Sequence, residues 1–495
     1  MKYEVVIGLE VHSQLLTESK MFCSCKSQYQ GLEPNTVVCP VCIGMPGTLP
    51  VVNSKAVELA IATGLALKCK IDQRTKFDRK NYPYPDLMKG YQISQYDRPI
   101  ASSGILEILV DGLNKKIRIN RVHLEEDVAK LFHSQVDDSS SYSLLDINRA
   151  GIPLMEIVSE PDMGSPEEAR AYLISLRSIL QYIKVSTANM EEGNFRCDAN
   201  ISLKEFEDKK LGPKVEIKNM NSFKAVYEAL QYEITRQSSI KDEGGRILSE
   251  TRGWMEAEGM TVSQRSKEEI ADYRYFPEPD IPPVEIDAST IAAINDNLPE
   301  LPNVKKNRFI DEYKLNGYDA SMIISSVEIA EYFETVMTSK PLSEQNKAIY
   351  AKNTANWIIG DISKLIDESG QNISDFKFTP ESFFELIDSI ISGKFSNAMA
   401  KQVFVEMSKS GISPDEIAKQ QGLVQISDSS TIEAAIDDVL NGNMGSVADY
   451  LDGKLNVLRY LVGQVMKETK GKVNPQKTTE LLQVKLEDLK NKSGN

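Results

Sequence analysis

The sequence predicts an α+β protein in which a strand-rich region comes first and helical regions follow. Apolar and polar residues alternate in several segments of residues 1–290, which is the pattern of half-buried strands. The passage 276–283 holds four prolines and therefore predicts a rigid connector. Beyond about residue 290 the apolar residues recur mostly at helical spacing, as they do over 383–390.

The length of the chain predicts several domains. Its 495 residues are too many for one ordinary hydrophobic core, and the usual size of a domain suggests about three. The sequence Gly411-Ile412-Ser413-Pro414 predicts a break before a last helical module. We therefore expect a mixed domain over residues 1–293, a helical domain over 294–408 and a small helical tail over 409–495.

Four segments of the first domain show which elements to expect. Residues 3–14 alternate between apolar and polar side chains, with Val6 as the exception, and 196–204 and 214–218 repeat this strand pattern. A helix should begin after Ser165, because Ser165-Pro166-Glu167-Glu168 is a capping box with proline at the first helical position.

Composition indicates a soluble protein. Hydrophobic residues make up 41% and charged residues 26% of the chain, which argues against disorder. No apolar run approaches the roughly 20 residues that span a bilayer. Glu4 stands where a signal peptide would need apolar residues. We expect a cytoplasmic protein that has no membrane partner.

Charge is distributed unevenly along the chain. The formal net charge of −15 does not favour nucleic-acid binding, because affinity for phosphates comes mainly from Lys and Arg. Acidic residues dominate from 406 to 453, but the sign reverses from 454 to 477. The basic residues of that run are Lys454, Arg459, Lys467, Lys470, Lys472 and Lys477, opposed only by Glu468. Such a run is most often a solvated helix face, yet it is the best local candidate for an RNA contact.

Four of the six cysteines lie within twenty residues: Cys23, Cys25, Cys39 and Cys42. Cys39-Pro40-Val41-Cys42 is a C-x2-C knuckle, and two such pairs across a loop can fill a tetrahedral zinc site. Disulfides are the weaker alternative in a cytoplasmic protein, and free thiols are the other. We predict structural zinc with every coordination position filled by protein. The remaining two cysteines, Cys69 and Cys197, are predicted to be ordinary core residues.

Two acidic patterns are candidates for a catalytic site. Glu10 and His12 share one face of the first predicted strand, and His123-Leu124-Glu125-Glu126-Asp127 follows a strand expected over 116–122. Neither pattern is specific: the first is more often a hydrogen-bonded surface pair, and the second is usually a solvated turn. If the fold joins them, oxygen and imidazole ligands suit Mg²⁺ or Mn²⁺.

Basic residues nearby could meet phosphate oxygens. Arg79-Lys80-Asn81-Tyr82 and Lys89 are the candidates. Asp198 lies on the polar face of its own predicted strand, where the alternative role is a partner for Arg196. The chain has neither a G-x4-G-K-[ST] loop nor a G-x-G-x-x-G loop, so a Walker ATPase and a Rossmann enzyme are unsupported.

Long ordered motifs carry a resemblance to one family. These are Val6-Ile7-Gly8-Leu9-Glu10-Val11-His12, Phe77-Asp78-Arg79-Lys80-Asn81-Tyr82, Lys89-Gly90-Tyr91-Gln92-Ile93-Ser94-Gln95, His123-Leu124-Glu125-Glu126-Asp127, Glu156-Ile157-Val158-Ser159-Glu160-Pro161-Asp162, Arg196-Cys197-Asp198-Ala199-Asn200 and Asp272-Tyr273-Arg274-Tyr275-Phe276-Pro277-Glu278-Pro279-Asp280. They cover the first domain, and the chain resembles the GatB family, the B subunits of bacterial aspartyl/glutamyl-tRNA amidotransferases.

The resemblance implies a reaction and partners. Such a protein transfers the γ-phosphate of ATP to the side-chain carboxylate of Asp on tRNA(Asn) or Glu on tRNA(Gln). Ammonia, released from glutamine by an A subunit and led through a channel, then displaces phosphate. The misacylated tRNA and a small C subunit are the other implied partners. The resemblance also implies a β-rich cradle fold for the first domain and a tail that grips tRNA.

The resemblance also assigns roles to residues. Glu10, His12 and Glu125 match Mg²⁺-binding positions, and Glu126 would line the ammonia route. Lys80 and Lys89 would contact phosphates or polar channel atoms, and Asp198 would lie in the same pocket. The basic residues Lys454, Arg459, Lys467, Lys470 and Lys472 fall in the tail and would contact tRNA. Two alternatives stay open: a non-catalytic tRNA-binding or assembly subunit, and an archaeal-type relative, whose extra inserted domain has no room in this chain.

Overall fold

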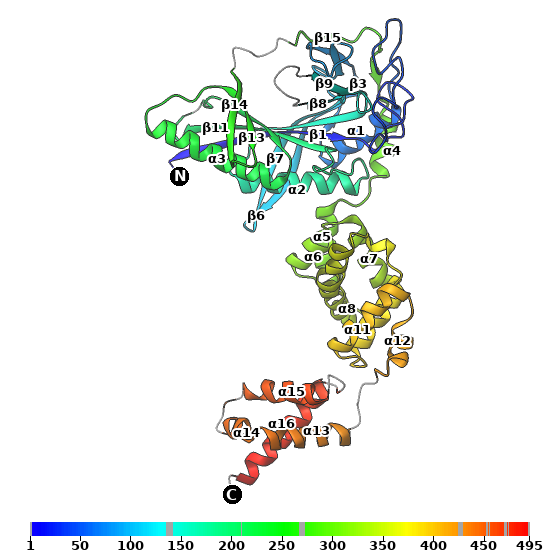
Figure 1. The fold of residues 1–495 in the computed structure, drawn as a ribbon, viewed down its shortest axis with the longest axis vertical. Helices are drawn as coiled ribbons and strands as arrows, with labels where there is room; N and C mark the ends of the chain where they lie inside the picture. Colours follow the sequence, from blue (N-terminus) through cyan, green and yellow to red (C-terminus); the bar gives the residue numbers. More distant parts are fainter. Residues whose placement is uncertain are drawn as a thin grey trace. The chain divides into compact units, whose positions relative to one another are not determined.

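The computed structural model of the chain describes residues 2–134, 142–208, 210–266, 273–423, 429–451, 454, 456–469, 473 and 475–493. The chain forms two compact units, Met1–Pro302 and Asn303–Asn495 (Figure 1). Strands are confined to the first unit and helices dominate the second, over the residues described. The predicted α+β class is therefore confirmed. The division into three domains stays a prediction.

The first unit contains sixteen strands and four helices in its described part. They are β1 (Tyr3–Gln14), α1 (Ser54–Ala66), β2 (Lys70–Ile71), β3 (Arg74–Thr75), β4 (Asp78–Asn81), β5 (Tyr91–Ser94), β6 (Ala101–Val110), β7 (Leu113–Glu126), β8 (Lys130–Ser134), β9 (Tyr142–Asp146), β10 (Pro153–Ser159), α2 (Pro166–Tyr182), β11 (Phe195–Glu205), β12 (Val215–Met220), α3 (Phe223–Asp242), β13 (Glu250–Met255), β14 (Met260–Ser266), β15 (Phe276–Pro277), β16 (Val284–Glu285) and α4 (Ala288–Asp296).

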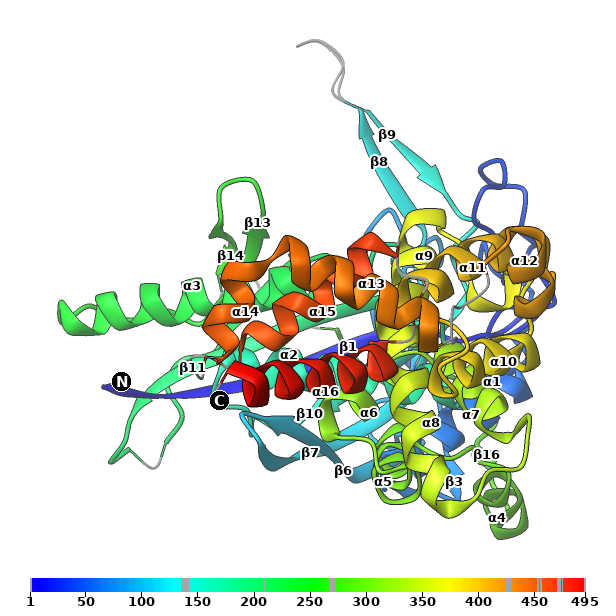
Figure 2. The same ribbon diagram turned by 90° about the horizontal axis from the view of Figure 1, so that it is seen from below.

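One large twisted sheet organises this unit. Its strand order is β14-β13-β12-β11-β1-β10-β7-β5-β4-β15, and β6 pairs with both β7 and β2. All of these pairs are antiparallel except the one between β12 and β13. β8 and β9 form a separate two-stranded hairpin that extends away from the large sheet (Figure 2). The central strands β1, β10 and β7 lie deep inside the sheet, where side chains can be shielded from water.

β1 has one apolar face and one polar face, because successive side chains of a strand point to opposite sides. Ile7, Leu9 and Val11 are buried in a hydrophobic core that they share with Leu173 and Leu176 of helix α2. Glu10 and His12 project from the opposite face. The predicted strand over residues 3–14 is thereby confirmed with its bounds. The core holds one face rigid, so the other face can carry polar groups at fixed positions.

Helix α2 begins where the capping signal predicts. The Ser165 hydroxyl accepts a hydrogen bond from the backbone N–H of Glu168 at 3.2 Å. In a complete capping box the Glu168 carboxylate would also accept a hydrogen bond from the backbone N–H of Ser165. Here it accepts from the N–H of Gly164 and from Lys115 instead. The carboxylate therefore connects the start of α2 to β7 rather than closing on Ser165.

The proline-rich passage is not wholly irregular. Phe276–Pro277 forms the short strand β15 at the edge of the sheet, paired with Asp78 and Arg79 of β4. Proline is tolerated in β15 because no further strand of the described residues pairs with this edge, so no hydrogen bond from a backbone N–H is required there. Beyond it, helix α4 packs Ile291 and Ile294 against the core of the first unit.

The second unit is helical throughout its described part. Its elements are α5 (Pro302–Tyr313), α6 (Gly317–Ile323), α7 (Val327–Thr338), α8 (Glu344–Trp357), the π-helix η2 (Ile358–Ile362), α9 (Ser363–Ser369), the 3₁₀ helix η3 (Ile373–Asp375), α10 (Pro380–Ile391), α11 (Asn397–Ser410), α12 (Pro414–Gln420), α13 (Ser429–Gly442), α14 (Met444–Leu451), α15 (Val457–Glu468) and α16 (Pro475–Ser493). The predicted break is present, because α11 ends at Gly411 in the left-handed conformation and α12 begins at Pro414. Helices α13–α16 share a hydrophobic cluster centred on residues such as Ile436, Leu461 and Leu482.

Among the residues described, no helix combines the length and the apolar character that crossing a bilayer requires.

Candidate functional site

A row of charged and imidazole side chains crosses four neighbouring strands. In the register of the sheet, Arg196 of β11 pairs with His12 of β1, His12 with Glu156 of β10, and Glu156 with His123 of β7. Directly paired residues of antiparallel strands present their side chains on the same face. The row is therefore built by strand register alone, without a loop.

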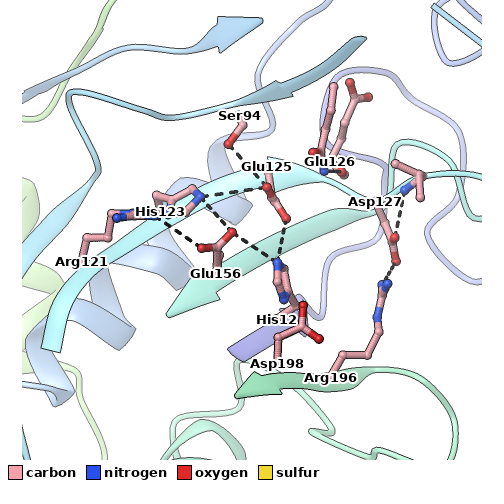
Figure 3. A network of polar contacts seen from close by, with 12 residues as sticks. His12, Ser94, Arg121, His123, Glu125, Glu126, Asp127, Glu156, Arg196 and Asp198 are labelled. Carbon is pink, nitrogen blue, oxygen red and sulfur yellow. Dashed lines mark hydrogen bonds and ion pairs between the residues drawn. The ribbon is translucent and has the colours of Figure 1, made fainter. Parts of the chain in front are cut away.

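Three side chains of this region come together in a geometry that could hold a metal ion (Figure 3). One ligand atom each from His12, Glu125 and Glu156 lies within 4.8 Å of the others. The His12 Nε2 atom is 3.2 Å from Glu156 Oε2 and 3.5 Å from Glu125 Oε1. His123 Nε2 is 3.4 Å from the same Glu156 oxygen, and Arg121 reaches the other at 3.6 Å. Two carboxylates and one imidazole are a donor set that suits Mg²⁺ or Mn²⁺.

Burial and neighbouring charges shift the pKa values of His12 and His123 in opposite directions. Burial alone would lower the pKa of His12, but its hydrogen bond to Glu156 and the charges of Glu156, Glu125 and Asp198 raise that pKa to about 9. Burial lowers the pKa of His123 to about 4, and the charge of Arg121 adds to this effect. His12 therefore carries the positive charge of the cluster. His12 has to lose the proton that carries this charge before its imidazole can bind a cation.

The pKa values of the two carboxyl groups in the cluster are also shifted in opposite directions. Burial and the charge of Glu156 raise the pKa of Glu125. Burial would also raise the pKa of Glu156, but His123, His12 and Arg121 hold it below its ordinary value. Carboxyl groups whose pKa values are shifted in opposite directions at one site are typical of active centres.

The cluster lines a cavity of about 600 Å³. Of the residues predicted from sequence, Glu10, His12, Lys80, Glu125 and Asp198 all line it. Glu10 is not part of the three-residue cluster, and its Oε1 accepts a hydrogen bond from Asn200 at 2.9 Å. The alternative of a Glu10–His12 surface pair is wrong, because His12 contacts Glu125 and Glu156 instead.

Asp198 and its neighbours form a charged wall of the same cavity. Lys218 donates to Asp198 at 2.6 Å and lies 3.2 Å from Glu216. Both carboxylates raise the pKa of Lys218 against the lowering effect of its burial. The alternative of an Asp198–Arg196 pair is wrong, because Arg196 forms its ion pair with Asp127. Lys218 lines the cavity as well, although it was not among the residues predicted from the sequence.

The acidic run 125–127 is not a solvated turn. Glu125 and Glu126 are the last residues of β7, and they are only 2% and 5% exposed. Asp127, which follows them, is 2% exposed and accepts hydrogen bonds from Gln14 at 2.7 Å and from Arg196. Asp127 thus ties the ends of β7, β1 and β11 together at the wall of the cavity.

Glu126 and Lys89 lie away from Glu125, because successive residues of β7 point to opposite faces. They form an ion pair, and the N–H of Ile93 donates to Glu126 at 3.0 Å. Both line a second cavity of about 200 Å³ that also borders Cys23 and Cys42. The structure therefore places Lys89 with Glu126, and Lys80 with the acidic cluster.

The four predicted cysteines form one cluster. Their sulfur atoms lie within 4.8 Å of one another, and no disulfide joins them. The knuckle is closed by the N–H of Cys39, which donates to Cys42 Sγ at 3.1 Å. Hydrogen bonds from Cys23 and Cys39 and the charge of Lys20 lower the pKa of Cys42 to about 5 against its burial. Four thiols at this spacing can hold a metal ion, and tetrahedral Zn²⁺ is the ion that such a donor set suits. Cys69 and Cys197 are buried core residues, as predicted.

The basic run of the tail is described in part. Arg459 and Lys467 are exposed on α15, whose Leu461 and Val465 are buried. Lys454 is exposed and donates to Asp449 at 2.8 Å. Lys470 and Lys472 lie outside the described residues.

Glu156 is the main site residue that was not predicted from the sequence. A signal for it exists: Glu156 interrupts the otherwise apolar stretch Leu154–Val158, and a lone carboxylate in a buried strand needs a partner. Its partners come from β1 and β7, and only the strand register reveals them.

Fold and site together define an α+β protein whose sheet domain holds a candidate metal-dependent active site. Comparison with known proteins gives the particular family. A family model described as "GatB/GatE catalytic domain" matches residues 5–292, and one described as "GatB domain" matches residues 332–486. The chain belongs to the GatB family.

Relatives match this chain over nearly its whole length. Proteins named as the B subunit of aspartyl/glutamyl-tRNA(Asn/Gln) amidotransferase are 54% identical in Dehalococcoides mccartyi (strain CBDB1), 50% in Carboxydothermus hydrogenoformans and 48% in Thermomicrobium roseum. The alignments cover 98%, 99% and 98% of this chain, and 99%, 100% and 99% of the respective relatives.

Proposed function

We propose that the chain is the B subunit of a glutamine-dependent tRNA amidotransferase, an ATP-dependent carbon–nitrogen ligase. It would convert Asp-tRNA(Asn), Glu-tRNA(Gln) or both to the amidated forms. The observation that carries the proposal is the position of His12, Glu125 and Glu156 in the main cavity of the domain that the catalytic family model matches. The full-length similarity to relatives of that name supports it.

The chemistry requires two steps at one place. A carboxylate is a poor electrophile, so one of its oxygens first attacks the γ-phosphorus of ATP and ADP leaves. Ammonia then attacks the carbonyl carbon of the acyl phosphate, and inorganic phosphate leaves as the amide forms. The first step brings two negative groups together, and the second develops negative charge on the departing phosphate, so the site must offset charge while it excludes water.

The residues of the cavity suit this task. We assign His12, Glu125 and Glu156 to holding Mg²⁺, with Glu10 beside them, on the strength of their donor atoms and spacing. When bound, Mg²⁺ would offset the charges of the ATP phosphates and the substrate carboxylate. Lys80 lines the same cavity, and we assign its ammonium to pairing with phosphate oxygens. Lys218 holds Asp198 in place.

A second group of residues suits the supply of ammonia. Glu126 and Lys89 line the smaller cavity beside the cysteine cluster, and paired charges there offer polar contacts to ammonia. We assign the cysteine cluster to structural Zn²⁺, which would fix the loops that wall this cavity.

The proposal implies partners and a location. An A subunit with glutaminase activity, a small C subunit and the misacylated tRNA are required, and the basic residues of α15 are the tRNA contacts that we propose in the tail. A translation enzyme of this kind acts in the cytoplasm.

Reconstitution tests the proposal. The chain is mixed with A and C subunits, ATP, glutamine and each misacylated tRNA, and amidated product is measured. We expect His12→Ala and Glu125→Gln to abolish ATP-dependent amidation while glutaminase activity of the A subunit survives. Glu107→Gln on β6, a half-exposed carboxylate paired with Lys68, is the matched control and should remain active. Unimpaired product formation by both cavity variants would contradict the assignment.

A further inference from the structure

Four tyrosines form a continuous wall on one side of the main cavity: Tyr82, Tyr96, Tyr273 and Tyr275. The rings of Tyr96 and Tyr275 are stacked, with centroids 4.2 Å apart and planes 13° from parallel. Tyr82 meets Tyr273 edge-on at 5.6 Å, and Tyr273 meets Tyr275 edge-on at 6.3 Å. The wall is therefore one connected set of aromatic contacts.

The usual reason for clustered aromatic rings is a hydrophobic core, and that reason does not apply here. None of the four tyrosines belongs to the core cluster of the first unit, over the residues described. Tyr96 is 59% exposed even though its ring is stacked on Tyr275. Stacking covers one face of the Tyr96 ring, so its exposure leaves aromatic surface free to receive a ligand.

The backbone of the wall is held in an unusual conformation. Arg274, between two of the tyrosines, has φ of 43°, which residues other than glycine seldom adopt. Two hydrogen bonds from Asn81 fix the segment: its backbone N–H donates to Tyr273 O and its Nδ2 donates to Arg274 O, both at 2.8 Å. An uncommon conformation that specific hydrogen bonds maintain often marks a functional segment.

The wall adjoins both the basic and the acidic groups of the cavity. The Lys80 ammonium lies 5.0 Å from the ring centre of Tyr273 and 5.9 Å from that of Tyr82. Burial raises the pKa of Tyr275, and the charges of Glu125 and Glu156 raise it further. A flat apolar surface thus lies next to a cation suited to phosphates and to carboxylates suited to a metal ion.

We propose that Tyr96 and Tyr275, continued by Tyr273 and Tyr82, form a stacking platform for a nucleobase. The inference rests on the proposed function, which brings two adenosine-containing ligands to this cavity. An aromatic face stacks on any base, so the adenine of ATP and the terminal base of the tRNA share the chemistry. Lys80 would then receive the phosphates attached to the stacked nucleoside.

Binding measurements on the full-length chain test the platform. The variants are Tyr96→Ala and Tyr275→Ala, with Tyr96→Phe and Tyr275→Phe to keep the ring and remove the hydroxyl. Tyr318→Ala, at a 67% exposed tyrosine of the second unit, is the matched control. Calorimetry gives Kd for a non-hydrolysable ATP analogue with Mg²⁺ and for inorganic tripolyphosphate with Mg²⁺, which has no base. A second arm compares whole tRNA with the same tRNA lacking its 3′-terminal adenosine.

Each arm identifies a different source of the base. If the platform receives ATP, the Ala variants weaken the ATP analogue by about 10-fold or more and leave tripolyphosphate unchanged. If it receives tRNA, the Ala variants lose the preference of the wild type for the complete 3′ end. In both cases the Phe variants and Tyr318→Ala behave like the wild type.

The negative outcomes are distinguishable. Equal losses for ligands with and without the base, or no loss in either arm, would overturn the platform while leaving the proposed function intact. If the Ala variants fail to fold, Tyr→Leu at the same positions removes the ring with less loss of volume. A wild-type chain that binds neither nucleotide nor tRNA would overturn the proposed function and the platform with it.

Discussion

His12 and Glu156 are direct cross-strand partners, and the Nε2 atom of His12 lies 3.2 Å from Oε2 of Glu156. This contact joins His12, which belongs to the strand pattern predicted over residues 3–14, to Glu156, which was not predicted as a site residue from the sequence. Glu156 also contacts His123 and Arg121, so it is the common neighbour of three positively charged or imidazole groups. The pairing follows from the register of β1 with β10, and a shift of one residue would turn Glu156 to the core face.

Removing the charge of Glu156 should weaken both metal binding and catalysis. We expect Glu156→Gln to raise the Kd for Mn²⁺, measured by electron paramagnetic resonance, by at least about 10-fold. Amidation should fall by about 10²–10³-fold, the scale of losing one electrostatic group of an active site. Glu107→Gln serves as the control. Wild-type Mn²⁺ affinity in Glu156→Gln would remove Glu156 from the proposed ligand set.

Asp127 should contribute more to the free energy of unfolding than an exposed aspartate does. Its carboxylate is buried and bonded to Arg196 and Gln14, and removing one partner of a buried ion pair costs about 3–5 kcal/mol. We therefore expect Asp127→Asn to lower Tm markedly. Asp242→Asn removes an exposed partner of Lys2 and should leave Tm almost unchanged. Equal Tm values for the two variants would show that the hydrogen bonds and ion pair of Asp127 do not stabilise the fold.

The sequence predicts the first strand well because β1 separates a hydrophobic core from a polar cavity, and that division produces an alternation of apolar and polar residues that only Val6 interrupts. β7 is different. It continues through Glu125 and Glu126, where each carboxylate is satisfied by a partner from another strand or loop, His12 in one case and Lys89 in the other. Such partners are distant in sequence, so the local pattern resembles a solvated turn. For the same reason the partners of Glu156 and Lys218 become recognisable only after the strands are paired.

Gly44 should be required for the position of Lys89. A Cβ atom at Gly44 would lie 2.3 Å from Lys89 Cγ, whereas a Cβ at Gly47 would meet nothing within 4 Å. Both glycines have a left-handed backbone, so alanine is strained at either position. We expect Gly44→Ala to cost about 1–3 kcal/mol more than Gly47→Ala, since it adds a steric clash. Thermal unfolding measures the difference, and equal Tm values would show that Lys89 moves freely.

Lys20 should stabilise the metal-bound cysteine cluster. Its side chain is buried at 1% exposure, and its Nζ lies 2.8 Å from Val37 O and 3.9 Å from Cys42 Sγ. A buried ammonium needs negative charge nearby, and four thiolates around Zn²⁺ would supply it. We expect Lys20→Met to release zinc to a chromogenic chelator about 10-fold faster than wild type. Lys26→Met, at a more exposed lysine of the same loop, is the control, and equal release rates for the two variants would contradict a role for Lys20.

The exposed basic residues of α15 should contribute to tRNA binding through phosphates. Arg459 and Lys467 are exposed, while Leu461 and Val465 anchor the helix in its own hydrophobic cluster. Replacing Arg459 and Lys467 by alanine should therefore weaken tRNA binding without unfolding α15. Each lost phosphate contact should also reduce the slope of log Kd against log salt concentration by about 1. The control replaces the exposed Lys364 of α9. If both sets of variants show the same affinity and slope, the basic run is only a solvated face of the helix.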